Sequence, residues 1–323
     1  MTLHEHVEVY LAAMQTRGLA GLTIRNQRSH LTRFAAFLEG LDVTDVGELV
    51  RDHVEAYMDE LASKPTRSGR PMKPETRNVR LSSIKAFCRR LTTDDLIAID
   101  PAESVAYCRE PTSLPKNILS EEEMRKLLAA PDPQTLIGFR DRVALELLYS
   151  TAVRVAELCG LDVVDVETGE GFARVRHGKG DQDRVVPVGK LACELVQSYL
   201  GEVRPALLAR RRDAKGELAL ILSQYGARLG RAGVAKLITR HVKTAGLTGR
   251  VTPPTFRHAC ATHMLRGGAN VRHLQEMLGH KKLTSTEIYT RVTITELKEV
   301  HARFHPRGSV DEVDIRPPRP ERS

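Results

Sequence analysis

Four separated segments of the chain carry side chains that could act on a phosphate group. Arg154 precedes a helical pattern, Lys179 lies in a Gly-rich turn, and Arg257 lies near the start of a helix. Arginine makes permanently charged, bidentate contacts with phosphate oxygens, and lysine can give up a proton. His280 and Tyr289, further along, add an imidazole and a hydroxyl. Taken singly, each has an ordinary structural explanation. Arg154 could form an ion pair at a helix end, and Lys179 could lie in a solvated turn. His280 could be a helix-capping side chain, and Tyr289 could be a core residue.

A metal site is a competing interpretation of the segment TPPTFRHACATHML (252–265), which contains two histidines. His258 and His263 are five residues apart, whereas residues four apart share a helical face, and the chain has no H-E-x-x-H. The five cysteines are scattered without a C-x-x-C, which also disfavours a zinc ribbon or a disulfide framework. The sequence therefore predicts that the chain binds no metal and that its cysteines are free thiols.

The elements that must position these residues follow from apolar periodicity and capping signals. Helical patterns cover 22–40 and 73–91, and no strand is convincing before residue 108. Beyond a Pro-containing linker, helices are expected at 120–130, where Ser120 and Glu123 form a capping box, and at 139–150, 191–200 and 230–246. A β-hairpin is expected at 171–189 and a short strand at 218–222. Pro253 and Pro254 suit the first turn of a helix running to about Arg266, and Asn270 caps the next helix. A capping box of Thr284 with Glu287 predicts a third helix.

Composition indicates a soluble protein with a polyanionic partner. The chain has 323 residues, enough for two domains, with a net charge of +8, a pI of about 9.3 and a mean hydropathy of −0.29. Neither a membrane span nor a signal peptide is evident, so a cytoplasmic location is expected. Residues 64–90 contain nine Lys or Arg and one acid, Glu75. This stretch is either a solvated loop and helix face or a nucleic-acid contact.

Taken together, four ordered blocks resemble the tyrosine site-specific recombinases of the phage integrase family, especially the Xer-like branch, over roughly residues 3–306. The blocks are LLYSTAVRVAEL, VRHGKGDQDRVVPVG, TFRHACATHML and LGHKKLTSTEIYTRV, and the later ITELKEVHARFHPRG is also similar to the Xer-type segment. The resemblance implies a mainly α fold with a small β-hairpin or sheet (α+β). A helical core-binding, SAM-like domain (1–108) and a linker (109–117) would precede a catalytic domain with a C-terminal exchange helix (118–306) and a disordered tail (307–323).

The resemblance also implies a role for each candidate. Tyr289 would attack the scissile phosphate to give a 3′-phosphotyrosyl link and a free 5′-hydroxyl, and Lys179 would protonate the leaving oxygen. Arg154 and Arg257 would hold the nonbridging oxygens, and His280 would hydrogen-bond the phosphate.

Two further residues and the partners follow in the same way. Glu157 and His258 would brace the site. DNA contacts are expected from five basic residues: Arg77, Arg80, Lys85, Arg89 and Arg231. The implied partner is duplex DNA with specific recombination sites, bound by a homotetramer or by a hetero-oligomer with a related recombinase. A Holliday-junction intermediate is implied, no cofactor or metal is required, and the location would be cytoplasmic and nucleoid-associated.

The sequence departs from the family pattern at Pro254, which occupies the histidine position of H-x-x-R. Proline has neither a side-chain donor nor an N–H. The remaining groups could suffice, His258 or a water could substitute, or cleavage could be lost. In the last case the chain would be a DNA-binding or architectural partner of an active recombinase; a type IB topoisomerase is a further alternative. Ala152 replaces the glycine of T-G-x-R and is expected to have a negative φ.

Overall fold

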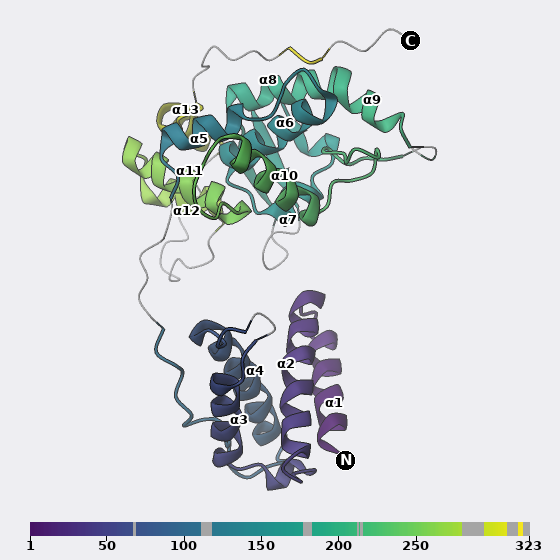
Figure 1. Cartoon of the computed structure of the whole chain (residues 1–323), viewed down its shortest axis with the longest axis vertical. Helices are drawn as coiled ribbons and strands as arrows, with labels where there is room; N and C mark the ends of the chain where they lie inside the picture. Colours follow the sequence, from purple (N-terminus) through teal and green to yellow (C-terminus); the bar gives the residue numbers. More distant parts are fainter. Residues whose placement is uncertain are drawn as a thin grey trace. The chain divides into compact units, whose positions relative to one another are not determined.

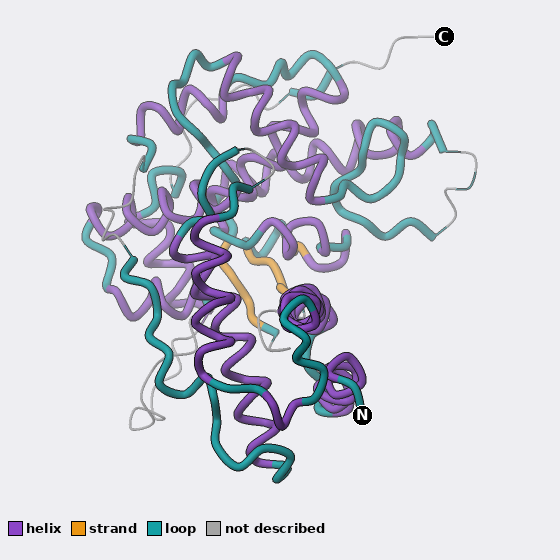
Figure 2. The backbone as a smooth tube through the Cα atoms, turned by 60° about the horizontal axis from the view of Figure 1, so that its bottom comes forward, coloured by secondary structure: helices purple, strands orange, loops and turns teal. Residues whose placement is uncertain are grey.

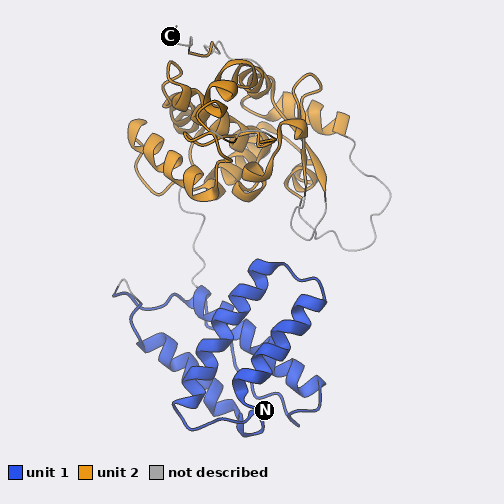
Figure 3. Ribbon diagram, turned by 90° about the vertical axis from the view of Figure 1, so that its right-hand side faces the viewer, with its two compact units in different colours: residues 1–114 blue, residues 115–323 orange. Residues whose placement is uncertain are grey.

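The computed structural model has two compact units, residues 1–114 and 115–323, shown in different colours in Figure 3. It describes residues 1–66, 69–110, 118–176, 183–211, 213, 216–279, 294–308 and 316–318. The chain is mainly helical with one small sheet in the described part, so the predicted α+β class is confirmed. None of the described helices combines the length and the apolar content that crossing a bilayer requires.

Unit 1 is a helical bundle with its own core. Its helices are α1 (Leu3–Thr16), α2 (Gly21–Glu39), α3 (Arg51–Ser63) and α4 (Pro74–Thr93), with a 3-10 turn at Val46–Glu48. The predicted apolar stripe of α2 is buried at Leu31, Phe34 and Leu38, because residues three and four apart share a helical face. Both α1 and α3 pack against α2, and α4 packs against all three (Figure 1).

Unit 2 is built around α6 (Leu136–Thr151), in which every residue from Gly138 to Thr151 is buried. The other helices are α5 (Glu121–Ala129), α7 (Val155–Gly160), α8 (Lys190–Ser198), α9 (Arg204–Leu208), α10 (Arg231–Thr244), α11 (Pro253–Gly267), α12 (Val271–Leu278) and α13 (Ile294–Phe304). Six of the helices around α6 contact it directly: α5, α7, α8, α9, α10 and α11. The predicted capping box of Ser120 with Glu123 opens α5.

The sheet of unit 2 is antiparallel, with strand order β1–β2–β3 (Figure 2). Its strands are β1 (Val166–Glu167), β2 (Phe172–Val175) and β3 (Arg184–Pro187), and Ala173 pairs with Val186. The predicted hairpin is therefore confirmed, and β1 is an additional strand. The turn that contains Lys179 lies outside the described residues.

The signals around the two prolines are also confirmed. Pro253 and Pro254 fill the first two positions of α11, and its C-cap residue Gly268 has φ 104°. The side chain of Asn270 accepts a hydrogen bond from the N–H of Arg272 and caps α12. The predicted capping box of Thr284 with Glu287 lies outside the described residues.

Three expectations need correction. Residues 218–222 form no strand and make only isolated bridges, Asp162 with Ala219 and Leu222 with Arg228. The helix expected at 191–200 continues as a π-helical turn (Tyr199–Val203) into α9. The predicted tail begins at residue 307, but Arg307 is buried and pairs with Glu146 at 2.8 Å, so the packed chain extends past that boundary.

Helix α13 packs within its own unit, against α11, α12 and β3. The exchange of this helix between protomers, which the family resemblance implies, stays a prediction.

Candidate active site

Arg154 is held in place by Glu157, one turn further along the chain. It occupies the N-cap position of α7, where its backbone N–H donates to Glu157 Oε2 and its Nη1 donates to Oε1, both at 2.8 Å. An acidic residue in the first turn of a helix is favourable because unpaired N–H groups point toward it. The carboxylate therefore fixes both the backbone and the guanidinium of Arg154.

Arg184, at the start of β3, is a functional candidate that the sequence analysis missed. Its Nη1 and Nη2 donate to the two oxygens of Glu157 at 3.0 and 2.7 Å, and its Nε donates to the carbonyl of Met277 at 3.4 Å. Two features of the sequence pointed to it: the pattern K-x₄-R across the hairpin (Lys179 to Arg184) and its place in the block VRHGKGDQDRVVPVG. Arg184 thus joins the hairpin to both α7 and the end of α12.

Arg257, on the first turns of α11, joins two other segments. Its Nη1 donates to the carbonyl of Ala152 at 2.8 Å, and its Nη2 donates to the carbonyl of Leu278 at 2.5 Å. The guanidinium is therefore attached to the α6–α7 turn and to the last turn of α12. Both contacts are with neutral acceptors, so its positive charge is left unbalanced by them.

Arg154 and Arg184 share the carboxylate of Glu157, and Arg257 lies near enough to be affected by all three charges. Among these four described side chains, positive charge is therefore in excess. Burial would raise the pKa of Glu157, but hydrogen bonds from Arg184 and Arg154 outweigh it and lower this pKa to about 2. Burial and the charges of Arg154 and Arg184 lower the pKa of Arg257 to about 10, although Glu157 acts in the opposite direction. The mutual repulsion of the three guanidinium charges favours an incoming anion.

The described chain reaches this cluster at Gly279 and resumes at Ile294. Gly279 ends α12 with φ 64°, and a Cβ there would lie 3.0 Å from Cδ of Arg184, so the close approach of Arg184 suits a glycine. Three of the five predicted catalytic residues, Lys179, His280 and Tyr289, lie outside the described residues. The structure brings together the other two, Arg154 and Arg257, through the α6–α7 turn.

Ala152 corrects an expectation about that turn. It has φ 50° and ψ 24°, so the prediction of a negative φ is wrong. The left-handed conformation brings Cβ close to the following carbonyl oxygen, and a glycine avoids this strain. Ala152 is the C-cap residue of α6, and its carbonyl accepts the hydrogen bond from Arg257.

Pro254 and His258 are both exposed on α11, one turn apart on the same side of the helix. His263, by contrast, is buried: its Nε2 donates to the carbonyl of Leu119, and its Nδ1 accepts from the hydroxyl of Tyr149, each at 2.8 Å. With both ring nitrogens occupied, His263 has a packing role, and the two histidines do not face a common site.

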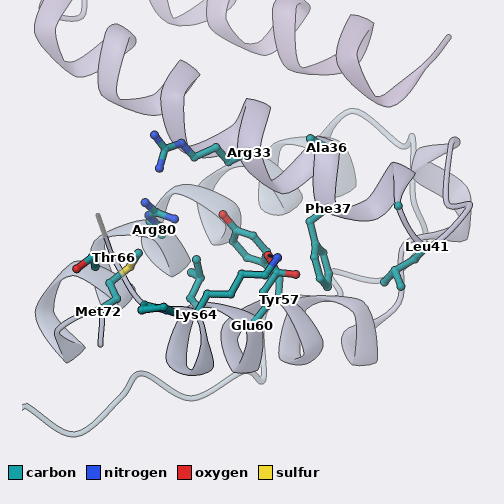
Figure 4. A pocket seen from close by; sticks show the side chains of 13 residues that line it. Arg33, Ala36, Phe37, Leu41, Tyr57, Glu60, Lys64, Thr66, Met72 and Arg80 are labelled. Carbon is teal, nitrogen blue, oxygen red and sulfur yellow. Dashed lines mark ion pairs between the residues drawn. The ribbon is translucent and has the colours of Figure 1, made fainter. Parts of the chain in front are cut away.

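The predicted DNA contacts of α4 fall into two groups. Arg80 lies beside Arg33 of α2 in a groove of about 910 Å³, above the buried ring of Tyr57 (Figure 4). Lys85 instead turns toward residues 103–107, where its ammonium donates to the carbonyl of Glu103 at 2.8 Å and lies 5.2 Å from the ring centroid of Tyr107. Contact between these side chains and DNA stays a prediction.

The remaining three predicted DNA contacts differ in exposure. Arg77 is half-buried, whereas Arg89 and Arg231 are exposed. Arg231 is the first residue of α10, and Cys159 of α7 lies near it.

Comparisons with known proteins identify the family to which the chain belongs. Residues 117–296 match the phage integrase family model, and residues 7–94 match the phage integrase N-terminal SAM-like domain. Tyrosine recombinase XerC 2 of Ralstonia nicotianae is 36% identical over 306 residues, which cover 95% of this chain and 87% of the relative. Tyrosine recombinase XerD of Listeria innocua is 35% identical over 90% of this chain and 95% of the relative.

Solved structures support the fold. The Tn1549 transposon integrase in complex with circular intermediate DNA aligns with a TM-score of 0.65 and 19% identity, over 91% of this chain and 98% of that one. A lambda integrase dimer bound to a core site also aligns with a TM-score of 0.65, at 18% identity, over 91% of this chain and 81% of that one. The family-model matches and the sequence identity to the Xer recombinases show that the chain belongs to the phage integrase family of tyrosine recombinases.

Proposed function

We propose that the chain is a site-specific DNA recombinase that cleaves and rejoins duplex DNA through a covalent phosphotyrosine. The observation that carries the proposal is the cluster of three arginines, in which Arg154 and Arg184 share the carboxylate of Glu157 and Arg257 lies close to both. A phosphodiester gains negative charge on its nonbridging oxygens as a nucleophile attacks, and guanidiniums fixed beforehand stabilise that charge without reorganisation.

The reaction conserves the phosphodiester bond. The hydroxyl of Tyr289 loses its proton to solvent as its oxygen forms a bond to phosphorus. The bond from phosphorus to the 5′-oxygen breaks, and Lys179 donates a proton to that oxygen. Arg154 and Arg257 hold the nonbridging oxygens, and His280 adds a hydrogen bond. The reverse attack by a 5′-hydroxyl of another strand rejoins the DNA, so the scheme needs no cofactor.

The proposed partner is duplex DNA carrying specific recombination sites, bound by several copies of the chain or by this chain with a related recombinase. Solved relatives include a lambda integrase tetramer bound to a Holliday junction. We assign the same kind of intermediate to this chain, together with a cytoplasmic, nucleoid-associated location.

A suicide substrate tests the proposal. DNA from the region flanking the gene is first footprinted to find the bound site. The substrate is a duplex of that site with a nick a few nucleotides to the 3′ side of the scissile phosphate. Cleavage then releases a short fragment with a free 5′-hydroxyl, which diffuses away and cannot reverse the reaction. Wild-type protein is expected to accumulate as a covalent adduct, and Tyr289→Phe is expected to bind the DNA without forming one. Binding without any adduct would instead support the non-cleaving DNA-binding partner that Pro254 raises as the alternative.

A further inference from the structure

The C-terminal end of α6 is capped by side chains from two other helices. The last carbonyl groups of a helix have no partner within it and must find one elsewhere. Here the carbonyl of Ser150 accepts from His301 Nε2 at 2.8 Å, and that of Tyr149 accepts from His305 Nε2 at 3.2 Å. The carbonyl of Ala152 accepts from Arg257. The histidines of the α13 segment and an active-site arginine therefore hold the same four-residue stretch.

The hydrogen-bond partners of both imidazoles show which ring nitrogen carries the proton. The rings of His301 and His305 are stacked, with centroids 4.4 Å apart and planes 9° from parallel. A carbonyl oxygen only accepts, so Nε2 carries the proton in each ring, and Nδ1 of His305 accepts from the backbone N–H of Arg307 at 3.0 Å. Both histidines are buried, so loss of either donor would leave a carbonyl of α6 unsatisfied in the interior.

The residues of α6 and of the segment after β3 pack closely against these two rings. A Cβ on Gly189 would lie 3.0 Å from Cε1 of His301 and 3.1 Å from Oγ of Ser150. The same Oγ accepts from the Gly189 N–H at 2.8 Å, which joins the end of β3 to the end of α6. Arg307, just past α13, pairs with Glu146 of α6 at 2.8 Å. The two histidines therefore pack between α6, which Arg154 follows, and β3, which begins at Arg184.

We propose that His301 is a positioning residue for the arginine pair, and that docking of α13 through its capping of α6 holds Arg154 and Arg257 in their active arrangement. Helix α13 begins five residues after Tyr289. Docking of the helix that follows the nucleophile and alignment of the phosphate-binding arginines are therefore one event. This inference rests on the proposed function, because it assigns His301 a role in the cleavage step.

The test compares three variants of the full-length chain. His301→Leu keeps a buried side chain of similar size but removes the donor. His301→Gln keeps an N–H donor at a similar reach. Glu299→Ala, at an exposed position of the same helix, is the matched control. DNA affinity and the single-turnover cleavage rate at saturating protein are measured well below the unfolding midpoint of each variant.

Substrate chemistry separates positioning of the arginines from a general loss of structure. A methylphosphonate at the scissile position replaces one charged oxygen by a methyl group, so cleavage depends less on the guanidiniums. The expected result is a fall of about 10-fold or more in the cleavage rate of His301→Leu on the normal phosphate, with DNA affinity unchanged. The deficit is expected to shrink on the methylphosphonate, and both His301→Gln and Glu299→Ala should stay within about 3-fold of wild type.

Two results would overturn the inference. One is a His301→Leu rate equal to that of wild type. The other is a deficit of the same size on both substrates that His301→Gln does not relieve. Failure of the proposed function itself looks different, because wild-type protein would then form no adduct on either substrate.

Discussion

Nη1 of Arg257 lies 2.8 Å from the carbonyl oxygen of Ala152, a residue held at φ 50°. The contact joins positions 105 residues apart and connects a phosphate-binding arginine to a strained turn. The strained residue is therefore the one whose carbonyl accepts the hydrogen bond from Arg257.

Replacing Ala152 with glycine should relieve that strain. Left-handed backbone costs a residue with a Cβ about 1–2 kcal/mol. Removing one buried methyl group offsets part of this gain. We expect Ala152→Gly to leave the free energy of unfolding unchanged or to raise it by up to about 1 kcal/mol, as measured by urea denaturation. A loss of more than about 1 kcal/mol would show that the methyl group packs more favourably than the conformation costs.

Substitution of Arg184 should slow cleavage more than it weakens DNA binding. The planar fork of arginine spans both oxygens of Glu157, whereas lysine is a point charge and cannot. We expect Arg184→Lys to lower the single-turnover cleavage rate by about 10-fold and Arg184→Ala by about 100-fold, with affinity for the site within about 3-fold of wild type.

Arg174, an exposed residue of β2 on the same hairpin, provides the matched control. Arg174→Ala should keep the wild-type cleavage rate at saturating DNA. Equal rates for Arg184→Ala and wild type would exclude a role for Arg184 in the site.

The stability of unit 2 should depend on pH through His301. Burial lowers the pKa of His301 to about 4, while hydrogen bonding to the Ser150 carbonyl opposes the shift. Between about pH 4 and 6.5 the unfolded chain binds a proton that the folded chain does not, so stability rises with pH across this window. The shift corresponds to about 3 kcal/mol at its full extent.

The variant His301→Gln does not titrate and should have a shallower pH dependence of the unfolding midpoint over that window. The stacked ring of His305, whose pKa burial also lowers, should leave part of the slope in place. An identical slope in the variant and in wild type would mean that His301 is not neutral and buried in the folded protein.

The effect of having proline at the family's histidine position can be tested by introducing histidine at position 254. Pro254 is exposed at the second position of α11, so Pro254→His removes no buried contact. The change restores a donor three residues before Arg257. We expect the cleavage rate to stay the same or to rise, in the suicide-substrate assay. A large fall in a stably folded variant would mean that the proline itself shapes the site.

Local signals in the sequence predicted the local structure well. The two prolines of α11, the Asn270 cap of α12 and the capping box of α5 each depend on neighbouring residues, and each is confirmed. The alternation of β2 and β3 likewise predicted the hairpin.

The contacts that assemble the site could not be predicted in the same way. The Arg184–Glu157 pair joins residues 27 apart, and the His301–Ser150 bond joins residues 151 apart. No local pattern encodes such partners. The prediction of a negative φ at Ala152 was wrong for the same reason. Local preference favours a negative φ for alanine, but Ala152 has φ 50° and its carbonyl bonds to a residue 105 positions away. The apolar run at 218–222 resembled a strand, but only single bridges form there.

Mass spectrometry of the trapped complex tests the central claim most directly. After trypsin and nuclease digestion of the adduct on a suicide substrate, the nucleotide remnant should lie on the peptide of residues 283–291, at Tyr289. The adduct should be absent from Tyr289→Phe. A remnant on any other residue, or no covalent remnant despite saturated binding of the site, would contradict the proposal that this chain cleaves DNA through Tyr289.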